Sequence, residues 1–490
     1  MVKLFSFEEE YNMKKTKIIT SLGPSSYIPD VFEQMVLNGA NVARINFSHA
    51  TEEEKEKDVA TVKEVTKRTG LHIGILYDTK GPEFRNGVLE NDEINLVEGK
   101  TIRVVKENVI GNEERFSVNH PNAIDSLEVG NVILLENGLM KMTVVSKEED
   151  GVTCKIINGG VLGNKKSLSV PGVKLDIPFI SEQDREDIIY ACNHDGDFLA
   201  LSFVSCVEDV LEAKKILKEQ NREDLKIISK IENMTGIENL DSIVEESDGI
   251  MVARGDLGVE VPMTMLPIYQ KKIIRKCREK GKFCIVATEM LESMKKSARP
   301  TRAEVSDVAN AVLDGADAVM LSGETTTGKY PIETVKYMGE ICENAEKYYN
   351  GIFEYKDKIG ITETIADSVV ESTKVLNIKV VVASTVSGYS ARKISNLKPN
   401  SMILATCTSE KVARSLALNY GVYSCIVPVC NSTDEVVEIA KEKAKAMFNL
   451  QPKDKVVITG GFPNNGTKRI TNFMKIEEIK KVSRFICLFY

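Results

Sequence analysis

One arrangement of hydrophobic and polar residues recurs along the first 330 residues of the chain. A short apolar run, rich in β-branched residues, ends in polar side chains, and a stretch with apolar residues three and four apart follows it. The pattern predicts eight strands, each followed by a helix, that begin near Lys17, Asn41, His72, Asp197, Lys226, Gly249, Phe283 and Ala318. Alternating strands and helices imply parallel pairing, and eight such units favour a closed (β/α)8 TIM barrel over an open doubly wound sheet.

Two segments depart from this pattern. Residues 82–178 alternate apolar and polar positions and break at glycine and asparagine, which predicts a small antiparallel β-barrel domain inserted after the third strand. At that end of the barrel, the insert would lie over the mouth as a lid. From Ile361, four apolar runs alternate with helical stretches and predict an open α/β sheet. We therefore predict a barrel (1–81 and 179–350), a lid (82–178) and a C-terminal regulatory domain (351–490).

Composition narrows the class of protein. The 490 residues carry a net charge of −8, which argues against a nucleic-acid-binding or anionic-membrane-binding surface. No apolar run approaches the roughly 20 residues that span a bilayer. The 10 cysteines are scattered, without a C-x-x-C pair, and Cys192 and His194 have no further metal ligands near them in the sequence. These features predict a cytoplasmic protein with reduced thiols and no zinc site.

Polar residues gather where the predicted barrel strands end, which is where barrels carry their functional side chains. Alternate residues of a strand share a face, so Arg44, Asn46 and Ser48 point together, as do Lys230 and Glu232. The other strand ends contribute Asp78, Thr79, Lys80, Arg254, Asp256, Thr288, Glu289, Ser322 and Glu324. Each could instead cap a helix or form a solvated rim, which is our interpretation of Glu324. The charged run from Glu52 to Lys57 is interpreted as the solvated face of a helix.

These residue types suit a phosphorylated, carboxylated small substrate. Glu232 and Asp256 offer hard oxygen ligands from neighbouring strands, as Mg²⁺ or Mn²⁺ requires. Gly255 allows backbone N–H groups to approach an anion at the start of the following helix. Arg44, Arg85 and Lys230 supply the positive charge that a transferring phosphoryl group needs. Arg254, Gly255 and Asp256 also spell an adhesion tripeptide, but the apolar strand directly before them argues against an exposed adhesive loop.

Several long motifs resemble those of the pyruvate kinase family. They are RINFSHA, DTKGPEFRNG, SKIEN, MVARGDLGVE, ATEMLESM and RPTRAEVSDVANAVLDGADAVMLSGET, in the family's order and spacing. The resemblance covers all three predicted domains. It implies transfer of the phosphoryl group of phosphoenolpyruvate to ADP, which gives pyruvate and ATP in the last step of glycolysis. It also implies a homotetramer.

The resemblance assigns roles to individual positions. It implies that Lys230 stabilises the phosphoryl group and the enolate, that Thr288 lies where the enolate is protonated, and that Arg44 contacts phosphate. The backbone around Gly255 and Asp256, with Thr288, would hold the substrate carboxylate. Nucleotide contacts would come from Arg85, Asn46 and His49. The divalent ion (Mg²⁺ or Mn²⁺) would bind Glu232 and Asp256, and K⁺ would bind Asn46, Ser48, Asp78 and Thr79. Glu83 matches a position where glutamate accompanies dependence on a monovalent cation.

Two positions depart from the family's pattern and make nucleotide contacts harder to assign. Glu289 stands where glutamine is usual, and Thr327 stands where many members have a lysine that contacts nucleotide phosphates. Neither change removes the residues that the phosphoryl chemistry needs.

A loop of the C-terminal domain predicts an allosteric site. Its hydroxyls and glycine lie between a strand and a helix start, where fresh N–H groups bind phosphate: Ser384, Thr385, Ser387, Gly388 and Ser390. Similar loops in pyruvate kinases bind a sugar-phosphate activator, and Lys468 or Arg469 could close over it. The effector could be a sugar phosphate or a nucleotide. The alternative is an ordinary capped helix start, which accounts for one serine.

Two other functions would use the same residues. A metal-dependent lyase or aldolase acting on a pyruvate enolate needs the two carboxylates but neither an ADP site nor a lid. A homologue retained for binding or regulation would need no chemistry, but Lys230 and both metal ligands are present, which argues against it.

Overall fold

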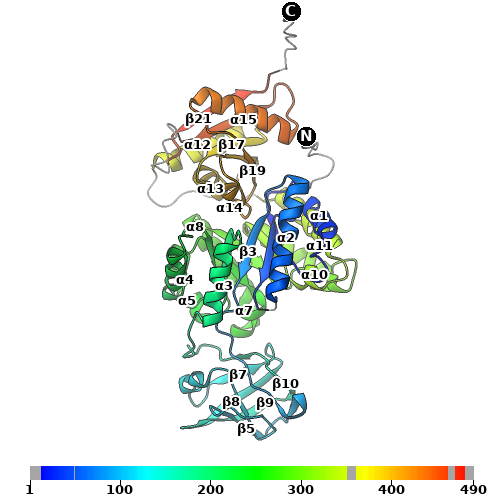
Figure 1. The fold of residues 1–490 in the computed structure, drawn as a ribbon, viewed down its shortest axis with the longest axis vertical. Helices are drawn as coiled ribbons and strands as arrows, with labels where there is room; N and C mark the ends of the chain where they lie inside the picture. The colour runs from blue at the N-terminus through cyan, green and yellow to red at the C-terminus, as the bar shows by residue number, and fades with distance from the viewer. Residues whose placement is uncertain (1–12, 49, 350–359, 462–469, 481–490) are drawn as a thin grey trace, which may run out of the picture.

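The computed structural model describes residues 13–48, 50–349, 360–461 and 470–480. Three domains lie in a row, with the C-terminal α/β domain at one end, the barrel in the centre and the β insert at the other end (Figure 1). The barrel mouth therefore faces the insert, and its opposite end faces the C-terminal domain.

The central domain is the predicted eight-stranded parallel barrel, closed in the order β1-β16-β15-β14-β13-β12-β3-β2. Its strands are nearly fully buried, as their continuous apolar sequences require. They are β1 (Lys17–Ser21), β2 (Val42–Asn46), β3 (Gly74–Asp78), β12 (Phe198–Leu201), β13 (Lys226–Ile231), β14 (Gly249–Ala253), β15 (Phe283–Ala287) and β16 (Ala318–Leu321). The eight predicted strands are confirmed.

Helices surround the barrel and bury one apolar face against it. In α9 the start is fixed by a capping box between Thr301 and Glu304, and the end by Gly315 at φ 98°. The barrel-domain helices are α1 (Pro29–Leu37), α2 (Glu52–Thr69), α3 (Glu182–Asn193), α4 (Val207–Glu219), α5 (Met234–Glu238), α6 (Leu240–Glu246), α7 (Arg254–Glu260), α8 (Leu266–Lys280), α9 (Arg302–Asp314), α10 (Gly323–Thr326) and α11 (Pro331–Glu346), with 3-10 turns at η3 (Met263–Met265) and η4 (Glu292–Lys295).

The insert follows β3 and forms a six-stranded sheet, β11-β7-β8-β9-β5-β6, and a two-stranded sheet, β10-β4, around one apolar core. Its strands are β4 (Glu93–Leu96), β5 (Thr101–Val105), β6 (Arg115–Ser117), β7 (Val132–Leu135), β8 (Met140–Glu148), β9 (Gly151–Asn158), β10 (Gly160–Gly163) and β11 (Leu168–Ser169), with η1 (Glu90–Asp92) and η2 (Pro121–Ser126). Pairing is antiparallel as predicted, except that β5 and β6 are parallel. Alternation predicts which face of a strand is buried, but it does not predict the direction of the neighbouring strand.

The C-terminal domain is the predicted open α/β sheet, with strand order β19-β18-β17-β20-β21. Its elements are α12 (Ile361–Val375), β17 (Val380–Thr385), α13 (Tyr389–Asn396), β18 (Met402–Cys407), α14 (Glu410–Ser415), β19 (Val422–Ile426), α15 (Thr433–Phe448), β20 (Lys455–Gly460) and β21 (Phe473–Glu478). The antiparallel edge strand β21 was not predicted, because its largely exposed sequence has no apolar run. No helix within the described ranges is long and apolar enough to cross a membrane.

Two ion pairs, each with a buried aspartate, join the C-terminal domain to the N-terminal ends of the barrel strands. Lys398 Nζ lies 2.7 Å from Asp317 Oδ1, and the other oxygen of Asp317 accepts a hydrogen bond from the backbone N–H of Cys284. Arg414 Nε lies 3.0 Å from Asp197, which also accepts from the N–H of Ile75. This end of the barrel is therefore occupied by structural contacts, and the opposite end is left for a site.

Candidate active site at the barrel mouth

A cavity of about 380 Å³ opens at the C-terminal ends of the barrel strands. Side chains from several strands and from the loops that follow them line it, so residues distant in sequence meet there. Of the predicted strand-end residues, the lining includes Arg44, Asn46, Asp78, Lys230, Glu232, Asp256, Thr288 and Ser322. The convergence predicted from the strand ends is confirmed for these residues.

Lys230 lies at the centre of the charged group. Its ammonium nitrogen is 3.1 Å from Asp78 Oδ1 and 3.1 Å from Glu232 Oε1, and it donates to Ser202 Oγ at 2.7 Å. The alternate positions of Lys230 and Glu232 at the end of β13 bring these two side chains to one face, as the sequence predicted. A buried ammonium with two carboxylate partners is fixed in place and remains charged.

The electrostatics of this cluster follow from burial and opposite charge. Although burial works against it, the carboxylates of Asp78 and Glu232 raise the pKa of Lys230 above its ordinary value. Against the effect of burial, Lys230 and Arg44 lower the pKa of Asp78. Burial raises the pKa of Glu232 to about 7, Lys230 opposes this, and the charge of Asp256 adds to it. Glu232 and Asp256 therefore repel each other across the cavity, and a bound cation would relieve this repulsion.

Arg44 extends the positive charge from β13 towards β2. Its Nε donates to Asp78 Oδ2 at 2.7 Å and its Nη1 donates to Ser21 Oγ at 2.9 Å. Asn46 pairs in register with Asp78, so both side chains leave adjacent strands at the same level. Arg44 is thus held by two neighbours while its guanidinium lines the cavity.

The oxygens predicted to bind K⁺ lie around the ends of β2 and β3. Asn46 Oδ1 accepts from the N–H of Ser48 at 3.2 Å. The backbone oxygen of Thr79 accepts from Ser202 Oγ at 2.7 Å. Asp78 is fully buried, and both of its carboxylate oxygens have cationic partners. The structure thus brings together the loop and strand ends that carry the predicted ligands.

Thr288 has a left-handed backbone, with φ 66°, which is strained for a β-branched residue. This conformation lets the Thr288 hydroxyl accept a hydrogen bond from the N–H of Gly255 at 2.7 Å. The bond ties the end of β15 to the start of α7. The N–H of Gly255 therefore has a side-chain partner in the structure. Strain at a strand end that lines a cavity is typical of functional positions.

Arg254 does not join the cations of the cavity. Its guanidinium turns away and forms two bonds to Asp307, at 2.8 and 2.7 Å, and one to the backbone oxygen of Thr288 at 2.7 Å. The prediction that it belongs to the group of charged strand ends was therefore wrong. Its partner comes from α9, more than 50 residues away, and such a pairing has no local sequence signal.

Two residues that the sequence analysis missed stand at the end of β12. Ser202 Oγ receives the bond from Lys230 and contacts Asp78 Oδ1 at 3.3 Å. Phe203, at φ 59°, donates its backbone N–H to Glu232 Oε2 at 2.6 Å. The position of Ser202 at a barrel strand end was the available signal, whereas a backbone donor such as Phe203 leaves none.

Two charged side chains, those of Glu324 and Lys55, are buried contrary to prediction. Glu324 is only 1% exposed and accepts from the N–H groups of Leu291 and Ser322, so it is not a solvated rim residue. Lys55, inside the run predicted to be solvated, is buried and lies 2.7 Å from Asp187. The N–H of Leu291 and the carboxylate of Asp187 both come from elements distant in the sequence.

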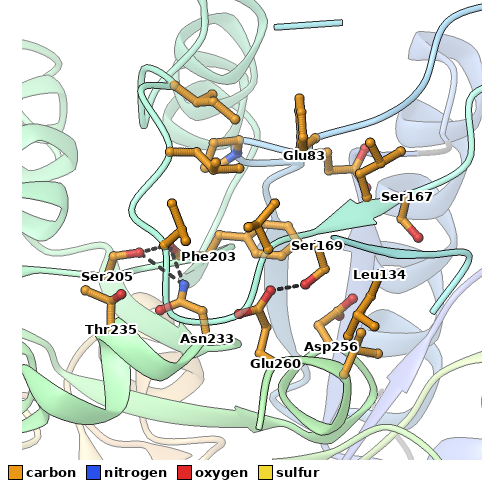
Figure 2. Close-up of a pocket in the computed structure, with 18 of the residues that line it drawn as sticks. Glu83, Leu134, Ser167, Ser169, Phe203, Ser205, Asn233, Thr235, Asp256 and Glu260 are labelled. Carbon is orange, nitrogen blue, oxygen red and sulfur yellow. Dashed lines mark hydrogen bonds between the residues drawn. The ribbon is translucent and has the colours of Figure 1, made fainter. Parts of the chain in front are cut away.

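A second cavity, of about 410 Å³, separates the barrel from the insert and meets the first at Asp256, which lines both. Figure 2 shows Glu260 of α7 reaching Ser169 of the insert, to which it is hydrogen-bonded, beside Asp256. Arg85 lines this cleft, where Glu83 holds it with bonds of 2.9 and 2.7 Å. The insert therefore covers the side of the site where Asp256, one of the two predicted metal ligands, lies.

The other residues singled out in the sequence do not all lie at the mouth cavity. Glu289 is exposed, and Thr327, which replaces the family's lysine, lines the mouth cavity. His49, Lys468 and Arg469 lie outside the described residues.

The predicted effector loop connects β17 to α13. Gly388 has φ 77°, which only glycine adopts without strain, and Arg392 donates to the backbone oxygen of Ser387 at 2.9 Å. Ser390 is buried with its hydroxyl 2.7 Å from that of Thr471. Ser384, Thr385 and Ser387 are the other hydroxyls of this loop, and Ser387 lies beside the guanidinium of Arg392.

Comparison with known proteins identifies relatives of this arrangement. The family model "Pyruvate kinase, barrel domain" matches residues 13–335, and "Pyruvate kinase, alpha/beta domain" matches residues 363–477. A pyruvate kinase of Geobacillus stearothermophilus is 44% identical over 473 residues, 95% of this chain and 80% of the relative. That of Bacillus licheniformis is 42% identical over 471 residues, with the same coverage.

A solved structure gives the same result. A crystal structure of a pyruvate kinase from Cryptosporidium parvum superposes with a TM-score of 0.89 at 37% sequence identity, and the match covers 95% of this chain and 96% of that one. Both family models and the structural likeness extend over the barrel and the C-terminal domain. The chain belongs to the pyruvate kinase family of phosphotransferases.

Proposed function

We propose that this chain transfers the phosphoryl group of phosphoenolpyruvate to ADP and releases pyruvate and ATP. The observation that carries the proposal is the buried Lys230 ammonium, held between Asp78 and Glu232 in one cavity with Arg44 and Asp256. A fixed positive charge in a water-poor site stabilises the charge that develops on the phosphoryl oxygens and on the enolate. Family membership supports this choice of substrates.

Individual residues would have the following roles in the reaction. Arg44 and Lys230 bind the phosphoryl oxygens while the bond to the enol oxygen breaks and a bond to the β-phosphate of ADP forms. Lys230 then faces the enolate. Thr288 holds the water from which the enolate carbon takes its proton, and the backbone at Gly255 and Asp256 holds the substrate carboxylate. Arg85, in the cleft beside Asp256, contacts the phosphates when the insert closes, and Asn46 and His49 contact the nucleotide.

Glu232 and Asp256 are the residues that would hold Mg²⁺ or Mn²⁺. The two carboxylates line one cavity and repel each other, which suits a divalent cation. In the described part of the chain, no three His, Cys, Asp or Glu side chains converge as a complete metal site. Substrate oxygens and water would therefore complete the coordination, and the bound ion would supply positive charge to the phosphoryl and carboxylate oxygens.

The test is a coupled assay of pyruvate formation from phosphoenolpyruvate with and without ADP. Pyruvate formation that requires ADP, with one ATP per pyruvate, supports the proposal. Turnover of a pyruvate-derived substrate without ADP would instead favour a lyase or aldolase on the same barrel. The insert at the barrel mouth and the Glu260–Ser169 contact favour the phosphotransferase, because an aldolase needs no lid.

We also propose that K⁺ activates the enzyme, bound by Asn46, Ser48, Asp78 and Thr79. We expect about 100 mM K⁺ to raise kcat roughly tenfold or more over a matched buffer of a bulky organic cation, because a fixed charge near the phosphoryl group acts in a poorly screened site. Glu83→Lys should weaken this dependence by placing a cation nearby. Glu83 now pairs with Arg85, so Glu83→Gln, which breaks the pair without adding positive charge, is the matched control and should keep the dependence. Equal rates in both buffers would refute the proposal.

The C-terminal loop is proposed to bind the phosphate of a sugar-phosphate or nucleotide effector, through Ser384, Thr385, Ser387, Gly388 and Ser390. The adjacent Arg392 supports an anion site. We expect an effector to lower the KM for phosphoenolpyruvate by about fivefold or more, which is typical of allosteric coupling. Ser387→Asp should remove the response by occupying the site with a negative charge, whereas Ser409→Asp, at the start of α14, should keep it. If wild type responds to no sugar phosphate or nucleotide, or if Ser387→Asp responds equally, the loop is structural.

The resemblance to pyruvate kinases also supports two broader proposals. We propose that the chain acts in the cytoplasm and that it assembles as a homotetramer. Sedimentation of the purified protein would test the assembly.

A further inference from the structure

Asp58, on the helix α2, is a buried carboxyl group without a partner. It is 5% exposed and lines the mouth cavity, together with Tyr27, Pro24 and Ala50. Among the described residues, none forms a hydrogen bond or ion pair with its carboxylate. Its carboxylate faces the cavity, where a donor from outside the chain can reach it.

The cavity has two sides with different chemistry. The predicted phosphoryl and metal residues lie at the ends of β13, β14 and β15. In the closed strand order, β1 and β2 lie diametrically opposite β13 and β14. Asp58 belongs to this second side, with the loop after β1. Arg44 at the end of β2 reaches Asp78 towards the phosphoryl side. An acceptor nucleotide with its phosphates at Arg44 would therefore extend its base towards Asp58.

The second side is chemically suited to a nucleobase rather than to phosphate. The Asp58 carboxylate repels phosphate and only accepts hydrogen bonds. The ring of Tyr27 and the exposed Pro24 offer flat surfaces on which a base can stack. Lys57 Nζ lies 3.4 Å from the centroid of the Tyr27 ring and fixes it from the α2 side. Asp58 is thus placed to receive N–H donors on the edge of a base that lies against this surface.

We propose that Asp58 is a specificity-determining residue that binds the nucleobase of the acceptor nucleoside diphosphate and favours guanine over adenine. The proposal rests on the proposed phosphotransferase function. Guanine presents two adjacent donors, N1–H and N2–H, which an ionised carboxylate accepts together. Adenine presents a single donor beside an acceptor, N6–H and N1, so an ionised carboxylate accepts one bond and faces a repulsive lone pair.

Protonation removes the advantage of guanine. Burial raises the pKa of Asp58 to about 7, the charge of Glu54 adds to this, and Lys57 opposes it. Tyr27 in the preceding loop, and Tyr77 and Tyr190, which feel the Asp58 charge, are the other titratable groups around it. Below this pKa the protonated group donates to adenine N1 and accepts from N6–H. The preference for GDP should therefore be present near pH 8 and be lost near pH 6.

The experiment compares ADP, GDP and IDP as acceptors with saturating phosphoenolpyruvate and Mg²⁺. Asp58→Asn offers one donor and one acceptor, which suits adenine at every pH. We expect it to lower the ratio of kcat/KM for GDP to kcat/KM for ADP about tenfold at pH 8, in line with discrimination by a bidentate contact. The change should fall on the KM of the nucleotide, and the pH dependence of the ratio should disappear. IDP, with N1–H alone, should lie between the other two.

Glu56→Gln is the matched control. Glu56 is exposed on another face of α2, so the same change of charge should leave the ratio unaltered. An unchanged ratio in folded Asp58→Asn enzyme would overturn the proposal. Asp58→Asn could also lower kcat/KM equally for ADP and GDP and use ADP and 2′-deoxy-ADP equally well. This result would assign Asp58 to the ribose and would also overturn the proposal.

Calorimetric binding of GDP and ADP to wild type and Asp58→Asn, without phosphoenolpyruvate, separates this proposal from the proposed function. A protein that binds GDP more tightly than ADP through Asp58, but transfers no phosphoryl group, would refute the function and leave the base contact standing. Active enzyme with equal binding of the two nucleotides at pH 8 would refute the base contact alone.

Discussion

Lys230→Met should lower kcat by about three orders of magnitude, because it removes the fixed charge that faces the phosphoryl group and the enolate. The ammonium nitrogen is buried and lies within 3.1 Å of both Asp78 and Glu232. Methionine keeps the length of the side chain, so the cavity keeps its shape. The measurement is kcat with saturating phosphoenolpyruvate, ADP and Mg²⁺, beside a thermal melt that reports folding.

Lys226→Met is the matched control for this variant. Lys226 begins the same strand at the opposite end of the barrel and pairs with Asp248 at 3.2 Å. Its loss should change stability slightly and leave kcat near the wild-type value. Near-normal turnover of folded Lys230→Met enzyme would contradict the assignment. The variant also leaves Asp78 and Glu232 buried without their shared ammonium, so a lower melting temperature at neutral pH is expected as well.

The sequence predicts those parts of the site that follow from strand periodicity. Lys230 and Glu232 are two residues apart on one strand, and Asn46 and Asp78 end neighbouring strands, so their convergence follows once a parallel barrel is inferred. The same reasoning assigned Arg254 to this group and was wrong. Alternation fixes where a side chain starts, but Arg254 is long enough to turn towards Asp307, and this choice depends on a helix distant in sequence.

Contacts that depend on backbone conformation could not be predicted in this way. The left-handed φ of Phe203 and Thr288 places a backbone donor on Glu232 and an acceptor for Gly255, although neither residue type favours that conformation. Tertiary contacts impose it. The burial of Asp58 could not be predicted from the sequence for a related reason. It follows a run of charged residues on α2 that is largely solvated, and only the packing of the helix against the loop after β1 shows that this carboxyl is buried.

Glu232→Gln or Asp256→Asn should each lower kcat by about two to three orders of magnitude and weaken Mn²⁺ binding, because each removes a charged oxygen ligand from a site that has only two carboxylates. The effect on metal affinity should be larger for Asp256→Asn. Glu232 already has Lys230 and the N–H of Phe203 as partners, whereas no side-chain hydrogen bond to Asp256 is found in the described residues. Asp256 is therefore freer to bind an ion.

Mn²⁺ binding measured by electron paramagnetic resonance, without substrate, separates metal affinity from chemistry. Glu246→Gln is the matched control, since this glutamate pairs with Lys214 near the surface before β14 and lies far from the mouth. It should bind Mn²⁺ and turn over as wild type does. Raising Mg²⁺ should partly restore Asp256→Asn if the lost activity reflects lost affinity. Folded Asp256→Asn enzyme with wild-type Mn²⁺ affinity would show that the ion binds elsewhere, and the repulsion between Glu232 and Asp256 would then need another cation, for which Lys230 is the nearest candidate.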